Sequence, residues 1–284
     1  MIIMQGVSKQ LKTFRLKDMN IEIPDGYICG LVGLNGAGKT TLLHLLLGLY
    51  RPDKGTVKID DREYPGMEKE IHDEMGTVLV EELLDPDASV MENGERYGKF
   101  YSHFNRQQYL DNLAQFHLAA NSRFGKLSKG QKLKCQFAFA LACNPKYLIL
   151  DEPTANFDPE FRTIFLKRIQ EFVSDGTRTV LLATHMTEDL DRLADYLIYL
   201  EKGNLIYSGD LETFRERYRI VSGEKYKIKL FSKEDLISLE ERAYGTKALI
   251  RHHGYNTYDP TLKVTYPSIE EFMYFYSKRG DESK

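Results

Sequence analysis

The sequence predicts an α/β protein whose central strands are parallel, and three observations lead to this prediction. Two short apolar segments, residues 146–150 and 179–183, are separated by a helical stretch over residues 159–175. Buried parallel strands joined by a crossover helix have this pattern. A third apolar segment, residues 27–32, runs into a glycine-rich turn and then into residues 39–49, whose leucines recur at helical spacing.

The flanking elements follow from simpler patterns. Residues 1–26 predict a flap of short antiparallel strands, because residues 19–23 alternate in polarity before a Pro-Asp-Gly turn. Residues 84–145 predict a helical subdomain, with residues 91–118 mostly helical. Four aromatic residues there share one helical face, and they form either ordinary core or the wall of a groove: Tyr97, Phe100, Tyr101 and Phe104.

The end of the chain predicts a second, smaller domain. Residues 205–207 indicate a short hairpin and residues 211–218 a charged helix, so we expect the main domain to end near residue 220. Residues 221–284 then predict a small α+β appendage, an accessory or dimerisation domain. Its expected elements are a strand over 225–231, a helix over 233–242, a pair of strands and a terminal helix over 268–278.

Composition excludes several classes of protein. The 284 residues carry 39 basic and 42 acidic side chains, a net charge of −3, which gives no field that would attract nucleic acid. The three cysteines form no CxxC pair, so neither a disulfide framework nor a zinc site is predicted, and a reducing cytoplasm is expected. The beginning of the sequence lacks the pattern of a secretory signal. The longest apolar run, residues 42–49, is too short to span a bilayer, so any membrane role is expected to be peripheral.

The strongest local motif is the run Gly-Leu-Asn-Gly-Ala-Gly-Lys-Thr at residues 33–40, between a predicted strand and a predicted helix. This is the P-loop pattern in the context that it requires. The loop N–H groups and the helix N-terminus attract phosphate, Lys39 adds a positive charge for the β- and γ-phosphates, and Thr40 is placed to bind Mg²⁺. The predicted nucleotide-binding residues here are Asn35, Gly36, Ala37, Gly38, Lys39, Thr40 and Thr41.

Two carboxylates end the apolar strand over residues 147–150. Asp151 and Glu152 therefore stand at the edge where an open α/β sheet binds its ligands. We expect Asp151 to hold Mg²⁺ with Thr40, and Glu152 to polarise the water that attacks the γ-phosphate.

A third motif, Leu-Ser-Lys-Gly-Gln at residues 127–131, precedes a predicted helix. It resembles the LSGGQ signature of ABC ATPases, with Lys129 in place of the first glycine. The resemblance implies that two such domains pair head to tail around two ATP molecules. Ser128, Lys129, Gly130 and Gln131 of one domain would then bind the ATP held by the other. The same run is also compatible with a plain helix N-cap at Ser128.

Further landmarks occur in the order of this family. Residues 153–159 resemble the D-loop, with Asp158 at the position that communicates across the dimer. His185 follows an apolar strand and resembles the switch histidine that contacts the γ-phosphate. A lone histidine is more often structural, but its place after this strand favours a catalytic role beside Glu152. The resemblance covers residues 1–220.

Two positions depart from the family pattern. The Q-loop glutamine should stand where the sequence has Val80, and we expect the adjacent Glu81 to take its place as the group linked to metal or water. The aromatic ring that stacks on adenine should lie near Leu11, so Phe14 is the candidate platform.

Within the family, the chain resembles ATPases of bacitracin-resistance and antimicrobial-peptide exporters, including the phenol-soluble modulin exporters. This resemblance implies an ATP-hydrolysing subunit that powers a separate membrane-spanning permease from the cytoplasmic face of the membrane, with peptides or amphipathic toxic compounds as cargo. A second ATPase subunit, identical or related, is the other expected partner.

Two other functions stay open. A soluble ABC ATPase acting on ribosomes or DNA needs two ATPase domains in one chain or a long coiled coil, and the sequence shows neither. A nucleotide-gated module without hydrolysis is disfavoured by Glu152 and His185. In the appendage, His252 and His253 suggest a metal site, but neighbouring residues on a strand point apart, which favours a surface turn.

Overall fold

The computed structural model describes residues 1–81, 84–243, 245–254 and 258–279. It has two compact units, one formed by Met1–Met186 with Ile198–Ser208 and the other by Thr187–Leu197 with Gly209–Lys284. The division therefore differs from the boundary predicted at residue 220. Helix α7 (Thr187–Leu193) belongs to the second unit because it packs against α10 (Ile269–Ser277). The carboxylate of Asp191 also accepts a hydrogen bond from the N–H of Ile269, at 3.2 Å.

The main sheet contains ten strands among the described residues, in the spatial order β5-β4-β1-β2-β10-β9-β3-β8-β7-β6. Their bounds are β1 Ile2–Gln10, β2 Arg15–Ile23, β3 Ile28–Val32, β4 Lys54–Ile59, β5 Arg62–Glu63, β6 Met75–Val78, β7 Tyr147–Asp151, β8 Thr179–Ala183, β9 Tyr196–Glu201 and β10 Asn204–Asp210.

The sheet has a parallel and an antiparallel part. Strands β3, β8, β7 and β6 are parallel neighbours, and every residue of β3, β7 and β8 is buried. Strands β1, β2, β4 and β5 pair in antiparallel fashion. The predicted parallel core and the predicted flap are therefore both confirmed. The continuous apolar runs reflect strands that are covered on both faces.

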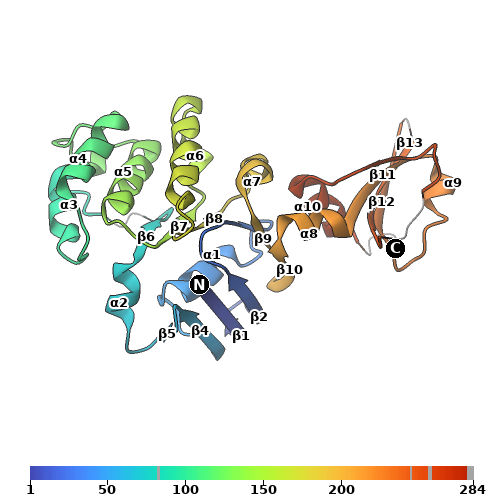
Figure 1. Ribbon diagram of the computed structural model, residues 1–284, viewed down its shortest axis with the longest axis horizontal. Helices are drawn as coiled ribbons and strands as arrows, with labels where there is room; N and C mark the ends of the chain where they lie inside the picture. Colours follow the sequence, from blue (N-terminus) through green and yellow to red (C-terminus); the bar gives the residue numbers. More distant parts are fainter. Residues whose placement is uncertain (82–83, 244, 255–257, 280–284) are drawn as a thin grey trace. The chain divides into compact units, whose positions relative to one another are not determined.

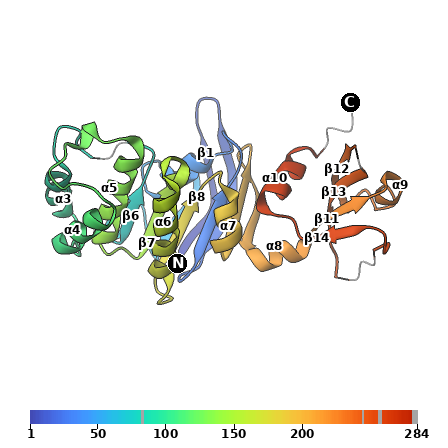
Figure 2. The same ribbon diagram turned by 90° about the horizontal axis from the view of Figure 1, so that it is seen from above.

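Helices surround the parallel strands and form the predicted helical subdomain. The six helices in the first unit's described residues are α1 Lys39–Leu46, α2 Glu68–Asp73, α3 Val90–Gly98, α4 Arg106–Gln115, α5 Lys129–Ala142 and α6 Pro159–Val173. Helices α3, α4 and α5 pack on one another, and α5 also packs on β6, so they form one group at the β6 edge of the sheet (Figures 1 and 2).

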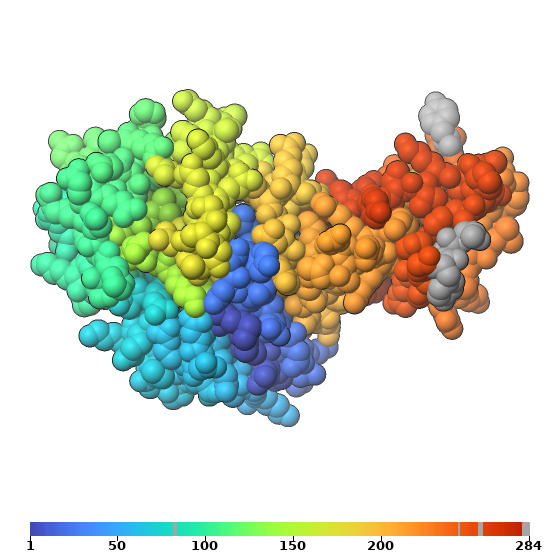
Figure 3. All heavy atoms as spheres, viewed as in Figure 1, coloured from blue at the N-terminus to red at the C-terminus, as the bar shows by residue number. Residues whose placement is uncertain are grey.

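Capping and ring packing hold this helical group together. Ser89 is the N-cap of α3 and Ser128 the N-cap of α5, each with a capping box in which side chain and backbone bond reciprocally. A Cβ added at Gly94 of α3 would lie only 2.1 Å from the Tyr109 ring of α4, so glycine permits this close approach. Figure 3 shows the group as a green surface that meets the cyan surface around α2. There the N–H of Ser102 donates to Asp73 at 2.6 Å.

The second unit contains a four-stranded antiparallel sheet in the order β12-β13-β11-β14. Its strands are β11 Tyr218–Gly223, β12 Leu236–Arg242, β13 Gly245–Arg251 and β14 Lys263–Thr265, and its helices are α7, α8 Leu211–Arg217, α9 Lys225–Ile228 and α10. Its apolar core includes Val221, Ile228, Ala248 and Ile250.

Two predictions for this unit were wrong. Residues 225–231 were expected to form a strand, but Lys225–Ile228 is a short helix, with Ile228 buried and Leu230 81% exposed. Residues 233–242 were expected to be a helix, but Leu236–Arg242 pairs with β13 as a strand. In both segments the tertiary partner outweighs the local pattern. The terminal helix was predicted correctly.

The two adjacent histidines of this unit bind different neighbours. The Nδ1 atom of His252 lies 2.5 Å from the hydroxyl of Tyr258, and the Nε2 atom of His253 lies 2.9 Å from the carboxylate of Asp235. The two rings therefore point apart, as the sequence predicts.

Candidate functional site

A cavity of about 500 Å³ opens where the glycine-rich turn meets the ends of β6 and β7. Fourteen residues line it, and they include all seven nucleotide-binding residues predicted in the phosphate loop and at its end, both predicted carboxylates and the candidate adenine platform. The lining residues are Leu11, Phe14, Leu34, Asn35, Gly36, Ala37, Gly38, Lys39, Thr40, Thr41, Val80, Glu81, Asp151 and Glu152.

The turn between β3 and α1 depends on glycine at two points. Gly36 has a φ of 77° and Gly38 a φ of 113°, both in the left-handed region that other residues rarely adopt. A Cβ at Gly38 would lie 2.7 Å from Cζ of Phe14. The turn can therefore curl beneath the Phe14 ring, which brings loop backbone and aromatic side chain to the same cavity.

Lys39 is buried at the floor of the cavity. Its exposed fraction is 8%, its Nζ atom donates to the carbonyl oxygen of Gly33 at 2.8 Å, and it lies 3.8 Å from Oε1 of Glu152. The ammonium group is thus held between the loop backbone and the Glu152 carboxylate. A phosphate entering the cavity would meet a positive charge that is already oriented.

Asp151 and Glu152 end strand β7, and the backbone turns sharply between them and the next element. Glu152 has a left-handed conformation (φ 46°, ψ 42°), and its N–H donates to the carbonyl oxygen of Ala183 at 2.8 Å. Burial raises the pKa of Asp151 to about 6, and the charges of Glu152 and Glu81 act in the same direction. All three carboxylates line the cavity, so its lining carries negative charge beside the ammonium group of Lys39.

His185 contacts the Glu152 side chain directly. Its backbone N–H lies 3.1 Å, and its Nδ1 atom 2.6 Å, from Oε2 of Glu152. The other oxygen of this carboxylate faces Lys39. The position of the carboxylate is therefore fixed from both sides, which is what a general base needs. This contact brings His185 to the predicted carboxylate, and its expected role at the γ-phosphate stays a prediction.

The segment after β6 carries the substitution predicted at the Q-loop. Val80 is 48% exposed, and Oε1 of Glu81 lies 3.7 Å from Nε2 of His44. Both residues line the cavity. A residue that sequence reasoning missed lies behind them: Gln136 of α5 is 4% exposed and contacts the backbone of this segment. No sequence pattern marks such a contact between distant segments.

The signature residues lie at the beginning of α5, outside the lining of this cavity. The hydroxyl of Ser128 accepts from the N–H of Gln131 at 3.2 Å, so the predicted N-cap is present. A Cβ at Gly130 would lie 2.4 Å from the carbonyl oxygen of Asn156, which places the signature against the D-loop. Asp158 caps α6 and forms an ion pair with Lys134 of α5, at 2.8 Å.

Mg²⁺ fits the donors that this cavity offers. Thr40 supplies a hydroxyl and Asp151 a buried carboxylate, oxygen donors of the kind that Mg²⁺ prefers alongside nucleotide phosphates. Outside the masked positions, the structure holds no group of three His, Cys, Asp or Glu side chains suited to a metal ion. A cation here would therefore depend on the bound nucleotide for its remaining ligands.

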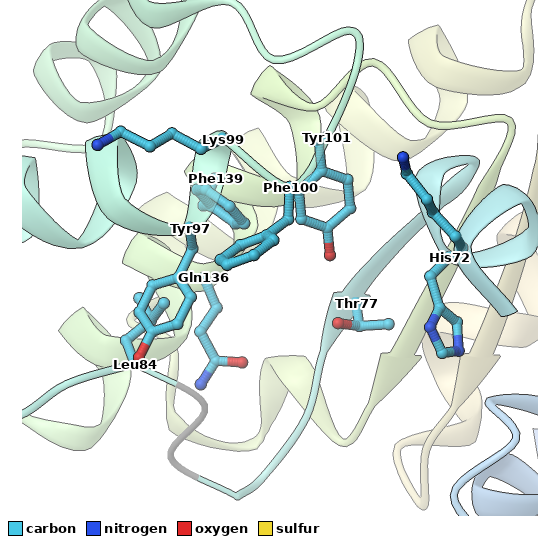
Figure 4. A pocket seen from close by; sticks show the side chains of 10 residues that line it. His72, Thr77, Leu84, Tyr97, Lys99, Phe100, Tyr101, Gln136 and Phe139 are labelled. Carbon is cyan, nitrogen blue, oxygen red and sulfur yellow. The ribbon is translucent and has the colours of Figure 1, made fainter.

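A second cavity of about 500 Å³ lies between α2, β6 and the helical group. Figure 4 shows Phe100 and Tyr101 side by side, with Thr77 and His72 to one side of them and Tyr97 to the other. Phe100 is 74% exposed. Phe104, the fourth member of the predicted aromatic face, instead packs on Phe139 with ring centroids 5.6 Å apart. The predicted helical face is not present, because α3 ends at Gly98 and Phe100, Tyr101 and Phe104 lie in the chain before α4. Three of the four rings nevertheless line this cavity, whereas Phe104 packs against another ring.

Comparisons with known proteins bear on this geometry. The ABC transporter family model matches residues 16–155. The chain is 34% identical over 214 residues to Nod factor export ATP-binding protein I of Rhizobium leguminosarum bv. viciae, covering 73% of this chain and 68% of that protein. The chain belongs to the ABC transporter family.

Another relative and the solved structures extend this result. Nod factor export ATP-binding protein I of Burkholderia lata is 34% identical over 196 residues, 67% of this chain, and the match spans slightly less than two thirds (64%) of that relative. The dimeric ATP-binding cassette MJ0796, in a post-hydrolysis state bound to ADP and Pi, has a TM-score of 0.67 and 26% identity, covering 74% of this chain and 99% of that one.

The ABC family assignment confirms the predicted fold. The main sheet, the P-loop and the helical subdomain form the P-loop NTPase fold of ABC ATPases, and the second unit adds a small antiparallel sheet. None of the described helices is long and apolar enough to cross a membrane. The narrower resemblance to bacitracin and phenol-soluble modulin exporters stays a prediction.

Proposed function

We propose that this ABC family member binds ATP with Mg²⁺ and hydrolyses the γ-phosphate to drive a membrane transporter. The observation that carries the proposal is the Glu152 carboxylate. It is held by His185 at 2.6 Å and lies 3.8 Å from Lys39, at the edge of the cavity that the phosphate loop forms. A phosphate-binding loop and an oriented general base thus share one cavity.

The roles of the residues follow from their positions. The N–H groups of residues 35–41 and the Nζ atom of Lys39 would bind the β- and γ-phosphates, and the Phe14 ring would cover the adenine. Glu152 would accept a proton from the attacking water, while His185 keeps the carboxylate in place and reaches toward the γ-phosphate. Thr40 and Asp151 would hold Mg²⁺, with Glu81 near, and the cation supplies positive charge that offsets the phosphates.

We further propose that the chain acts as a head-to-tail dimer, with an identical or a related second subunit. The residues from Ser128 to Gln131 lie outside the lining of the chain's own nucleotide cavity, so they are free to face the nucleotide of another subunit. Asp158, at the start of α6, would stand at the same interface. The dimeric form of the similar cassette MJ0796 supports this arrangement. The second unit would serve as an accessory or dimerisation domain.

The membrane partner would be a separate permease, which places the chain at the cytoplasmic face of the membrane. The second cavity offers a surface for it, because Phe100 is exposed at its edge and Lys69 and Lys99 flank an aromatic floor. This cavity is lined by Thr77 and Leu84, and the nucleotide cavity by Val80 and Glu81, so both include residues close to the end of β6. With a net charge of −3, nucleic acid is not among the proposed partners.

Export is the direction that we propose, with peptides or amphipathic toxic compounds as cargo. The relatives from Rhizobium and Burkholderia carry export in their names. The cargo class rests on the sequence resemblance to antimicrobial-peptide exporters.

Affinity purification of a Glu152→Gln variant tests the transporter proposal against a soluble ATPase acting on a macromolecular complex. The variant would be isolated from gently solubilised native cells with ATP and Mg²⁺, because loss of the base should trap the ATP-bound dimer. A polytopic membrane protein in stoichiometric amount supports the proposal. Recovery of soluble dimer alone, ribosomes or nucleic acid would overturn it in favour of the soluble ATPase.

A further inference from the structure

Gln136 occupies an unusual place for a polar side chain. It lies in the middle of α5, is 4% exposed, and lines the second cavity beside Phe139 and Thr77. A buried amide is stable only where its donors and acceptor find partners. The hydrogen-bond partners of Gln136 therefore indicate its structural role.

Both partners belong to the backbone of one short segment. The Oε1 atom of Gln136 accepts from the N–H of Leu79 at 3.1 Å, and its Nε2 atom donates to the carbonyl oxygen of Glu81 at 3.4 Å. In Figure 4 the side chain extends from α5 toward the chain that follows β6. One amide thus binds two backbone groups that lie two residues apart.

The N–H of Leu79 and the carbonyl group of Glu81 lie beyond the end of strand β6. Strand β6 is the last strand in the order of the main sheet and ends at Val78, so residues 79–81 continue beyond its ladder. The contacts with Gln136 replace the ladder for this segment. At its end stands Glu81, which lines the nucleotide cavity and lies 3.7 Å from His44.

Gln136 also connects this segment to the signature. Helix α5 begins at Lys129, directly after the signature residue Ser128. Gln136 lies eight residues after Ser128, which is about 12 Å along the helix axis at 1.5 Å per residue. A helix of this length moves as a stiff element. A shift of the signature on nucleotide binding would therefore be transmitted to the backbone on which Glu81 stands.

We propose that Gln136 is a positioning residue that binds residues 79–81 to α5 and so sets the place of Glu81 in the nucleotide cavity. This proposal rests on ATP hydrolysis as the proposed function. In this proposal the Gln136 side chain of α5, the helix that follows the signature, orients residues 79–81, the segment in which Val80 stands at the place of the Q-loop glutamine.

The test compares Gln136→Leu with a matched control, Asn112→Leu. Asn112 of α4 is also a buried amide, 5% exposed, and its Nδ2 atom donates to the carbonyl oxygen of Ala138 on the same helix α5, at 3.1 Å. Both variants remove a buried amide that links α5 to a neighbouring segment, and of the two only Gln136 bonds to residues 79–81. Their difference therefore separates positioning from general packing.

We expect Gln136→Leu to lower kcat for ATP by about tenfold or more, with KM within about twofold, since a misplaced group near the reacting atoms costs rate rather than binding. Asn112→Leu should keep kcat within about twofold. Added to Glu81→Gln, Gln136→Leu should lower kcat no further than about twofold, because the two residues act through one step. Equal kcat for Gln136→Leu and Asn112→Leu, or full additivity with Glu81→Gln, overturns the proposal.

Amide hydrogen exchange provides a readout that does not need hydrolysis. In Gln136→Leu we expect the amides of residues 79–81 to exchange about tenfold faster or more, and in Asn112→Leu to exchange as in the unchanged protein. Unchanged exchange in Gln136→Leu overturns the proposal. A protein that hydrolyses no ATP but shows this exchange pattern contradicts only the proposed function. If Gln136→Leu does not fold, Gln136→Glu serves instead: it loses the donor to Glu81, and wild-type kcat in this variant overturns the proposal.

Discussion

Two cavities of roughly 500 Å³ each are lined in part by residues in or near the end of β6, and they are built differently. The nucleotide cavity is formed by the backbone of a glycine turn and by carboxylates at strand ends. The second cavity is formed by aromatic side chains of α3 and α5 and the chain between α3 and α4. Strand ends and turns hold the reactive groups of the nucleotide cavity in place, whereas the shape of the second cavity depends on its exposed aromatic side chains. Substitutions in the nucleotide cavity should therefore change ATP hydrolysis, and substitutions in the second cavity should change binding of the partner.

The largest expected effect lies in the nucleotide cavity. Glu152→Gln keeps the shape of the side chain and removes the base, so kcat for ATP should fall by about 10²- to 10⁴-fold. ATP binding, which depends on the loop and Lys39, should change little. Steady-state hydrolysis and equilibrium nucleotide binding measure the two quantities.

Glu160→Gln is the matched control, because Glu160 is an exposed carboxylate at the beginning of α6. This variant should hydrolyse ATP within about twofold of the unchanged protein. A loss of activity in Glu160→Gln as large as that in Glu152→Gln would show that neither carboxylate acts as the base.

A smaller effect concerns stability and pH. Because the pKa of Asp151 in the folded protein is about 6, above the usual 3.8, the folded chain holds this proton more tightly than the unfolded chain. The contribution of Asp151 to the free energy of unfolding therefore falls as the pH rises from about 4 to about 6. Asp151→Asn should stabilise the nucleotide-free protein at pH 8 by about 1 to 3 kcal/mol.

Urea denaturation at pH 4, 6 and 8 measures this difference, which should vanish near pH 4. The same substitution should abolish Mg²⁺-dependent hydrolysis. A variant that is no more stable than the unchanged protein at any of these pH values would show that the Asp151 carboxylate is not destabilised in the cavity.

The smallest effect on hydrolysis is expected in the second cavity. Phe100 is 74% exposed, so Phe100→Ala should change stability by less than about 0.5 kcal/mol and leave hydrolysis without a partner within about twofold. In the purification with Glu152→Gln, however, it should reduce the amount of membrane protein recovered. Leu230→Ala removes a similarly exposed apolar side chain (81%) in the second unit and should leave that recovery unchanged. Equal recovery with Phe100→Ala would remove the second cavity as a docking surface.

The nucleotide cavity was predictable from sequence because each part is local. The phosphate loop needs glycines at fixed spacing, and Asp151 and Glu152 stand where a continuous apolar strand ends. The sheet then brings these segments together, because parallel strands end at one edge. His185 was chosen from the family resemblance and its place after an apolar strand, and the pairing of β8 with β7 brings it to Glu152.

The second unit and Gln136 show where such reasoning fails. Residues 225–231 alternate in polarity like a strand, yet Tyr226 and Leu230 are exposed and only Ile228 of these three is buried. Leu236–Arg242 is rich in residues compatible with a helix, but it pairs with β13 from Leu236 to Arg242, with one register shift between Leu236 and Ser238. Gln136 acts through residues 55 and 57 positions away, and no periodicity in the sequence encodes such a contact.

The contact between Phe14 and Gly38 has an optical consequence. The 284 residues contain no tryptophan, so the chain has no indole fluorescence of its own. Phe14 lies half-buried at the mouth of the nucleotide cavity, with its ring against the turn. A single tryptophan substituted there would be the sole indole emitter, and its emission would report nucleotide entry and release in real time without a label on the nucleotide.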